Sequence, residues 1–311
     1  MRSSPTAVPP APRRRAVSAK SLLYSQSFAP FLFVWPFVIT FLLFFAYPVI
    51  STVIMSFQQV VPGEVRFIGL DNYRKLWNPQ FHQALKISTM YTLWTLLVLI
   101  PVPLVLAVFL NSKLVFARNV FRSVLFVPAL TSVVVAGVIF RLMFGELEGS
   151  VMNTIVGWFG IPAQKWLFNS TTGMLVLVLL ASWRWMGINV IYFLSALQSI
   201  SKELYESADI DGAGVFQKFW SITLPLLKPI TIYVLTISIY GGFAMFTESY
   251  VFWTNNSPGD IGLTIVGYLY KQGFEFFDLG YGSTIGITLL GLILVINVIQ
   301  LKFFGLFRKE S

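Results

Sequence analysis

Residues 87–110, ISTMYTLWTLLVLIPVPLVLAVFL, are the stretch that decides the fold of this chain. The stretch carries no charged side chain. It is longer than the roughly 20 mostly apolar residues that an α-helix needs to cross a bilayer. The whole chain agrees, since 56% of its 311 residues are hydrophobic and 11% are charged, whereas soluble domains carry roughly 25% charged residues. The sequence therefore predicts an all-α integral membrane protein.

Five further segments match this first one in length and composition. They are residues 29–57, 120–144, 172–197, 226–253 and 283–306. Together the six segments predict six transmembrane helices in one domain over residues 28–306. The basic, Pro- and Ser-rich residues 1–27 are predicted to be a disordered tail, and residues 307–311 a short C-terminal tail. The loops 58–86 and 254–282 are each long enough for a short helix at the membrane interface.

Prolines inside the predicted spans indicate where the helices bend. The first span would be about 43 Å long at about 1.5 Å per residue, which exceeds the hydrocarbon core. It must therefore tilt, or bend at Pro36 or Pro48. Pro101, Pro103 and Pro128 are further predicted bend points. Such bends require neighbouring helices or water to satisfy the freed carbonyl groups.

Lys and Arg residues are divided unevenly between the two sides of the predicted bundle. If the N-terminus is cytoplasmic, most of the basic residues outside the spans fall on the cytoplasmic side, as the positive-inside tendency requires. Both termini and the loop 198–225 are then cytoplasmic. The basic tail is accordingly read as an orientation signal, and we expect no nucleic-acid partner despite the net charge of +9.

The sequence lacks most of the groups that catalysis or metal binding needs. It has no cysteine and a single histidine, His82, which excludes disulfides, thiolate sites and clusters of imidazole ligands. The phosphate-binding pattern GxxxxGK[ST] is absent, because the segment Gly212-Ala213-Gly214 followed by Lys218 has the wrong spacing. We therefore expect a chain that is not an enzyme and binds no cofactor directly. Any energy for uphill transport must come from another subunit.

A polar segment interrupts the apolar pattern between the fourth and fifth spans. Residues 201–214, SKELYESADIDGAG, predict a short amphipathic helix that ends at Gly212, since glycine adopts left-handed dihedrals at little cost. A second helix over residues 215–223 would follow. Such an elbow can insert into a groove on a soluble partner and transmit its rigid-body motion. The alternative is a helix that lies on lipid, but anionic lipid favours basic faces and residues 203–211 are net acidic.

The elbow resembles the EAA signature of ABC importer permeases. Glu206-Ser207-Ala208, Gly212, Ile222 and Leu224-Pro225 follow the family form Glu-Ala-Ala-x3-Gly-x9-Ile-x-Leu-Pro, with Ser207 as the one departure. The resemblance implies a type I importer permease whose elbow is the coupling helix that docks on an ATPase subunit. The docking residues that it implies are Glu206, Ser207, Ala208, Asp209, Asp211 and Gly212.

This resemblance extends over most of residues 28–306. FIGLDNY at residues 67–73 and RNVFR at residues 118–122 are similar to carbohydrate-uptake permeases of the maltose-transporter type. PGEV at residues 62–65 and ASWRWMGIN at residues 181–189 resemble the arabinose and arabino-oligosaccharide permeases of Gram-positive bacteria. The resemblance implies a multi-pass subunit of a sugar importer in the bacterial cytoplasmic membrane, surrounded by lipid. The partners that it implies are a second, homologous permease, two ATPase subunits that use the ATP, and an extracellular sugar-binding protein.

Aromatic and polar side chains in the fourth and fifth spans form a candidate sugar pathway. Sugar sites combine stacking aromatic rings with hydrogen-bonding groups. The residues of this kind are Trp183, Arg184, Trp185, Asn189, Tyr240 and Glu248. Arg184 costs about 2.5–3.5 kcal/mol in the middle of a span, so it needs a partner, water or the interface. Two structural alternatives stay open: an Arg184–Glu248 ion pair, and an Arg184 that reaches the interface beside a tryptophan belt.

A different class of transporter is the main alternative to the ATP-driven importer. An ion- or proton-coupled secondary transporter is typically built with several acids inside its spans, and often with an inverted repeat. Here Glu248 is the one acid inside the predicted spans, and the sequence shows no repeat. A membrane scaffold without a transport role would leave the polar elbow unexplained.

Overall fold

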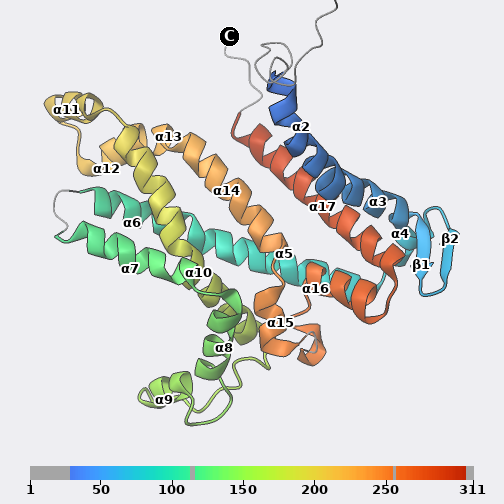
Figure 1. Ribbon diagram of the computed structural model, residues 1–311. Helices are drawn as coiled ribbons and strands as arrows, with labels where there is room; N and C mark the ends of the chain where they lie inside the picture. Colours follow the sequence, from blue (N-terminus) through green and yellow to red (C-terminus); the bar gives the residue numbers. More distant parts are fainter. Residues whose placement is uncertain (1–28, 113–115, 255–256, 306–311) are drawn as a thin grey trace, which may run out of the picture. The chain divides into compact units, whose positions relative to one another are not determined.

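The computed structural model describes residues 29–112, 116–254 and 257–305, so the predicted tails 1–27 and 307–311 lie outside the described residues (Figure 1). The chain divides after Thr52 into two compact units, each described here by itself. The first unit contains α2 (Ala29–Phe41), the π-helical turn η1 (Leu42–Ala46) and the start of α3 (Tyr47–Ser56). The π-turn precedes Pro48, which has no N–H to donate. The N–H of Tyr47 donates to the Leu42 carbonyl five residues back, which is the π-helical bond.

The described residues confirm a helical, multi-span fold. Five helices are long and apolar enough to cross a membrane, and up to six if one bent pair counts as a span. After α3 these spans are built from eight helices, which are α5 (Pro79–Leu99), α6 (Pro101–Asn111), α7 (Arg118–Leu130), α8 (Val133–Met143), α10 (Ser170–Ser199), α14 (Lys228–Phe243), α15 (Thr247–Trp253) and α17 (Leu279–Phe303). Breaks separate α5 from α6 and α14 from α15 within single spans.

The segment 120–144, predicted as one continuous span, is broken in the structure. Helix α7 ends at Leu130, α8 begins at Val133, and the two helices are bent by 96° at the break. Pro128 lies in the last turn of α7 and has no N–H to donate, and Thr131 and Ser132 adopt extended ψ angles of 135° and 133°. The bend that the sequence predicts at Pro128 is therefore a sharp break three residues later.

Helix α10 is the centre of the second unit, which begins at Val53. It packs against α5, α6, α7, α8 and α14. Its side chains Val176, Leu177, Leu180 and Phe193 are completely buried. Gly187 allows α7 to approach closely, because an added Cβ there would collide with the backbone carbonyl of Leu125. A buried helix of this kind fixes the side chains that it presents to its neighbours.

The β-hairpin at one end of the second unit was not predicted. Strands β1 (Gln58–Val61) and β2 (Glu64–Phe67) pair antiparallel, with Val61 opposite Glu64. The predicted interfacial segments contain α4 (Asp71–Lys75) in the first loop, and η3 (Pro258–Asp260), α16 (Ile265–Tyr270) and the π-turn η4 (Lys271–Glu275) in the second. A short helix α9 (Val151–Gly157) follows α8.

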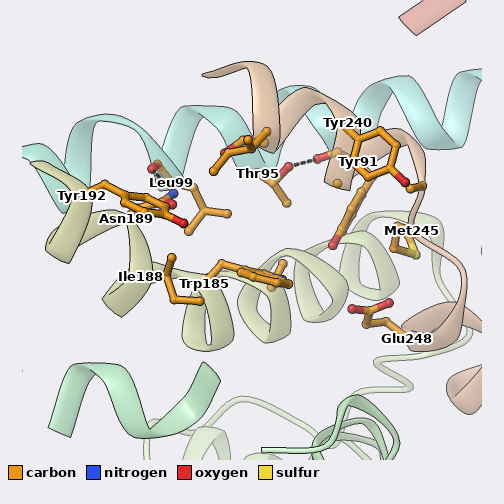
Figure 2. Close-up of a pocket in the computed structure, with 16 residues that line it drawn as sticks. Tyr91, Thr95, Leu99, Trp185, Ile188, Asn189, Tyr192, Tyr240, Met245 and Glu248 are labelled. Carbon is orange, nitrogen blue, oxygen red and sulfur yellow. Dashed lines mark hydrogen bonds between the residues drawn. The ribbon is translucent and has the colours of Figure 1, made fainter. Parts of the chain in front are cut away.

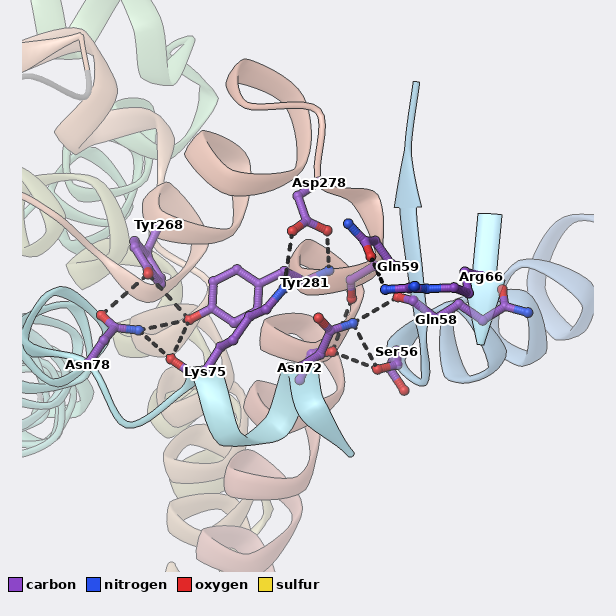
Figure 3. Close-up of polar contacts among 12 residues, drawn as sticks. Ser56, Gln58, Gln59, Arg66, Asn72, Lys75, Asn78, Tyr268, Asp278 and Tyr281 are labelled. Atoms are coloured by element: carbon purple, nitrogen blue, oxygen red, sulfur yellow. Dashed lines mark hydrogen bonds and ion pairs between the residues drawn. The ribbon is translucent and has the colours of Figure 1, made fainter. Parts of the chain in front are cut away.

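Buried polar contacts hold the hairpin and α4 to α17 (Figure 3). Asn72 is fully buried, and its Nδ2 donates to the carbonyls of Ser56 at 3.3 Å and Gln58 at 2.8 Å. Thr284 of α17 also donates to the Ser56 carbonyl, at 3.0 Å. A neighbouring set of hydrogen bonds joins Asn78 to Tyr281. These bonds explain why a two-stranded ribbon is ordered in a helical protein.

Candidate functional site

The polar segment between α10 and α14 folds as an elbow of short helices. Helix α11 (Lys202–Ile210) begins after Ser201, whose hydroxyl accepts a hydrogen bond from the N–H of Glu203 at 3.3 Å. Its last helical residue is Ile210, and Gly212 follows the C-cap residue with a φ of +74°. Ala213 N–H donates to the Ala208 carbonyl at 2.8 Å, and Gly212 N–H donates to the Asp209 carbonyl at 3.1 Å. These are the two bonds of a Schellman C-cap, so Gly212 ends α11 as its sequence position predicts.

The second arm of the elbow leads directly into α14. It contains α12 (Val215–Lys218), the π-turn η2 (Phe219–Thr223) and α13 (Leu224–Leu226). The π-turn precedes Pro225, which cannot donate the usual helical bond, and Leu224 N–H donates to the Phe219 carbonyl, five residues back. Leu227 is completely buried where α14 begins. The elbow is thereby anchored in the helical core.

Two side-chain contacts tie the arms of the elbow together. The hydroxyl groups of Tyr205 on α11 and Thr223 at the end of η2 lie 2.9 Å apart and share a hydrogen bond. Lys218 forms an ion pair with Asp209. Thr223 is itself 5% exposed, so Tyr205 is attached to a fixed point of the core. These two contacts therefore hold the arms of the elbow together and connect α11 to the segment that leads into α14.

The residues predicted to dock on a partner lie together on this elbow. Glu206, Ser207, Asp209, Asp211 and Gly212 are exposed, and Ala208 is half-buried. The apolar part of the same surface was not among the predicted docking residues, and it consists of Ile210, Val215 and Phe216 at 87%, 78% and 82% exposure. Acidic groups next to exposed apolar side chains are typical of a protein-docking surface. In Figure 1 the elbow lies at the end of α10 and α14 remote from α8 and α15.

A cavity of about 370 Å³ lies between α5, α10 and the α14–α15 break. Figure 2 shows its aromatic and polar lining. Trp185, Asn189, Tyr240 and Glu248 of the predicted sugar pathway line it. The volume falls within the range of about 300–1,000 Å³ typical of small-molecule sites.

Two predicted pathway residues lie outside this lining. Trp183 faces α8, where its ring centroid lies 5.8 Å from that of Phe140, and it is 42% exposed. Arg184 does not line the cavity and contacts two of the residues that do. Its guanidinium carbon lies 5.4 Å from the ring centroid of Trp185, and its Nη1 lies 3.4 Å from Glu248 Oε1. The structure thus contains the ion pair that the sequence left as one of two structural alternatives.

Arg184 also satisfies the backbone at the α7–α8 break. Its Nη2 donates to the Thr131 carbonyl at 3.4 Å, at the point where α7 has ended. Glu248 lies in the first turn of α15. A single guanidinium group on α10 therefore contacts two broken spans. Beyond the breaks, α8 and α15 pack together, and Arg141 donates to the Val251 carbonyl at 3.2 Å.

Asn189 has a structural partner as well as a place in the cavity wall. Its Nδ2 donates to the Leu99 carbonyl at 2.9 Å. That carbonyl would bond to the N–H four residues later in a continuous helix, but residue 103 is a proline. Asn189 of α10 therefore supplies the donor that Pro103 lacks, at the α5–α6 break.

Sequence reasoning missed the contribution of α5 to the cavity. Tyr91, Thr95 and Leu99 line the wall from this helix, and Tyr192 and Ser238 add polar groups from α10 and α14. The three α5 residues recur at a spacing of four, which places them on one helical face. From that spacing, sequence reasoning could have placed the three residues on one wall.

In the described ranges no group of three or more His, Asp or Glu residues could hold a metal ion.

The chain matches known proteins along most of its length. Residues 80–307 match a family described as "binding-protein-dependent transport system inner membrane component". The arabinooligosaccharides transport system permease protein AraP of Bacillus subtilis (strain 168) is 61% identical, over 94% of this chain and 93% of the relative. The AraP protein of Halalkalibacterium halodurans is 52% identical, over 92% and 90%. LacF of Rhizobium radiobacter, a lactose transport system permease protein, is 31% identical, over 86% and 91%.

Solved structures share the fold at lower identity. A bacterial ABC transporter involved in the import of the acidic polysaccharide alginate contains a chain that superposes with a TM-score of 0.81 at 24% identity, covering 91% of this chain and 97% of that one. The bacterial alginate ABC transporter in complex with alginate pentasaccharide-bound periplasmic protein gives a TM-score of 0.80 at 23% identity. These likenesses show that this chain shares the helical fold of the matched transporter chains.

Proposed function

Because the chain belongs to the family of binding-protein-dependent transport system inner membrane components, we propose that it is a permease subunit of an ATP-driven sugar importer whose substrates are arabino-oligosaccharides. The family match confirms the resemblance to importer permeases that the EAA-like segment predicts. The substrate class rests on the two AraP relatives. The membership argues against an ion- or proton-coupled secondary transporter.

The exposed elbow, whose two arms are joined by side-chain contacts, is the structural observation that carries this proposal. A subunit without its own phosphate-binding loop needs a mechanical input from a separate ATPase. Glu206, Asp211 and the exposed Ile210 form the surface that would enter the ATPase groove. The ties between Tyr205 and Thr223 and between Asp209 and Lys218 transmit displacement of α11 to the start of α14.

The cavity at the α14–α15 break is the proposed passage for the sugar. Trp185 and Tyr240 supply apolar ring surface for sugar C–H faces, and Asn189 and Glu248 supply polar groups. Because α14 connects the elbow to this cavity, motion of the elbow reaches the cavity through one helix. The proposed assembly adds a second, homologous permease, two ATPase subunits that bind and hydrolyse ATP, and an extracellular sugar-binding protein. This chain itself hydrolyses no ATP, and both of its termini are cytoplasmic.

The first test is whether the acidic elbow holds the ATPase. In the double variant Glu206→Lys/Asp211→Lys, two exposed acids become basic, and we expect recovery of the ATPase with the affinity-tagged permease complex to fall at least about tenfold, since truncated or reversed hot-spot charges cost about 2 kcal/mol or more. Recovery is measured by quantitative immunoblotting after solubilisation in mild detergent.

Glu148→Lys is the matched control, because Glu148 is an exposed acid in the loop between α8 and α9. This variant is expected to recover the ATPase at the wild-type level. Equal recovery with the double variant and the wild type would show that the elbow is not the docking surface. The proposed coupling between this permease and a separate ATPase would then have no identified contact.

A further inference from the structure

The charge of the cavity lining is the observation from which a further inference follows. Among the described residues that line the cavity, Glu248 is the only one with a charged side chain at neutral pH. Figure 2 shows its carboxylate directed towards the space between Trp185 and Tyr91. The other lining groups with polar side chains are hydroxyls, the indole of Trp185 and the amide of Asn189. A molecule in the cavity therefore meets one negative group.

The compensating positive charge lies outside the cavity lining. Arg184 pairs with Glu248 through Nη1, and the two side chains are 11% and 13% exposed. The Nη2 of Arg184 donates a hydrogen bond to the Thr131 carbonyl at 3.4 Å. The guanidinium group thus contacts the carboxylate without lining the cavity. The contacts of Nη1 and Nη2 limit the positions that the guanidinium group can adopt.

We propose that Glu248 selects neutral saccharides and rejects anionic ones, and that Arg184 is the positioning residue that keeps this carboxylate aimed into the cavity. This inference rests on the proposed function, since it assumes that sugar enters the cavity. A carboxylate accepts hydrogen bonds from sugar hydroxyls, and such charge-assisted bonds are roughly twice as strong as neutral ones. The rings of Trp185 and Tyr240 stack on either kind of sugar. The discrimination therefore comes from Glu248, which repels a uronate carboxylate at close range.

The test compares two probes of similar size on the complete transporter in lipid nanodiscs, without the sugar-binding protein. The probes are radiolabelled arabinotriose, which is neutral, and radiolabelled trigalacturonate, which carries carboxylates. We expect the wild-type transporter to bind arabinotriose at least tenfold more tightly. In Glu248→Gln the negative charge is lost and Arg184 keeps its own, so arabinotriose binding weakens at least tenfold and the preference disappears or reverses.

Two further variants separate this role from a merely structural one. Glu248→Asp keeps the charge and is expected to keep the preference for arabinotriose, even if both affinities fall. Glu148→Gln removes an exposed acid outside the cavity and is expected to bind both probes as the wild type does. Recovery of the ATPase with each variant reports whether the complex is assembled, because the elbow is not altered.

The outcomes distinguish this inference from the proposed function. If Glu248→Gln keeps the wild-type ratio of the two affinities, or if Glu248→Asp loses the preference, Glu248 is not the selective group although the cavity binds sugar. If the assembled wild-type transporter binds neither probe, the cavity is not a sugar site, and the proposed passage and the selectivity both fail. Wild-type preference for trigalacturonate would reverse the inference.

Discussion

Asn189 shows at the scale of one residue how a proline in one helix determines a side chain on another. Pro103 leaves the Leu99 carbonyl without its helical donor, and the Asn189 amide replaces that donor at 2.9 Å. Asn189 is 3% exposed, so water does not substitute for it readily. Inside a membrane protein, a carbonyl that has lost its helical donor is tolerated only where a neighbouring group donates a hydrogen bond to it.

Asn189→Ala should therefore destabilise the protein by about 1 kcal/mol, the typical value for a lost buried hydrogen bond between membrane helices. Introducing Pro103→Ala into this variant supplies an N–H for the α5–α6 segment and is expected to recover part of the loss. The measurement is a double-mutant cycle on the thermal unfolding midpoint in detergent. Additive effects of the two substitutions would show that Asn189 and Pro103 are not linked through the Leu99 carbonyl.

The polar residues inside the spans could be named from the sequence, but their partners could not. Arg184 and Glu248 were each singled out because charges are rare in apolar helices, and an ion pair between them was one of several readings. The pair depends on where α7 and α14 break, because these breaks place the Thr131 carbonyl and the first turn of α15 beside Arg184. Tyr91 and Thr95 were missed because an apolar helix with small polar groups predicts packing as readily as a cavity wall.

The elbow is the element whose local structure follows from its sequence and whose proposed role is to couple the ATPase to transport. Its Schellman cap is set by Gly212, but its stiffness comes from side chains nine and eighteen positions apart, which join Asp209 to Lys218 and Tyr205 to Thr223. These contacts leave Glu206 and Asp211 exposed. Asp209 belongs both to the predicted docking set and to one of these ties, whereas Glu206 and Asp211 belong to the docking set alone.

Loosening the elbow without changing its acidic surface should uncouple ATP hydrolysis from uptake. In Tyr205→Phe/Lys218→Met one hydrogen bond and one ion pair are lost, which together stabilise the elbow by about 1 kcal/mol. We expect ATPase recovery to be unchanged and the number of sugars imported per ATP to fall by about fivefold in proteoliposomes.

Tyr47→Phe is the control, since Tyr47 is an exposed tyrosine of α3. An unchanged ratio of sugar to ATP in the double variant would mean that the elbow does not need these ties to transmit motion. Loss of ATPase recovery would instead assign Tyr205 or Lys218 to the docking surface.

At the scale of elements, composition predicted the spans well, and the sequence predicted the α5–α6 break at Pro101 and Pro103 but not the α14–α15 break or the sharpness of the α7–α8 break. Long uncharged stretches identify helices in a bilayer because alternative backbone structures leave polar groups unsatisfied there. The hairpin at residues 58–67 was missed, although Pro62-Gly63 is a turn signal, because its order depends on Asn72 and Thr284 from distant segments. Likewise, Pro128 indicated a bend, but the 96° angle of the α7–α8 break depends on Arg184 and on the packing of α8 with α15.

For the whole molecule, the side of the membrane on which the elbow lies depends on this bent pair. Between the hairpin and the elbow the chain passes through α5 with α6, then α7 with α8, then α10. If α7 and α8 together cross the bilayer, three crossings place the elbow and the hairpin on opposite sides. If the pair enters and leaves on the same side, two crossings place them together, and the elbow cannot meet a cytoplasmic ATPase while the hairpin is outside.

Single introduced cysteines can resolve this topology, because the natural chain has none. Exposed positions on three segments are suited to the labels: Glu64→Cys on β2, Glu148→Cys after α8 and Ser207→Cys on α11. With a membrane-impermeant maleimide on intact cells, we expect the first two variants to react and Ser207→Cys to react only after permeabilisation. Reaction of Ser207→Cys in intact cells would place the elbow outside and overturn the coupling role. Protection of Glu148→Cys together with reaction of Glu64→Cys would show that α7 and α8 do not complete a crossing. The labelling pattern therefore decides whether α7 and α8 cross the bilayer despite their 96° break, as a cytoplasmic elbow requires.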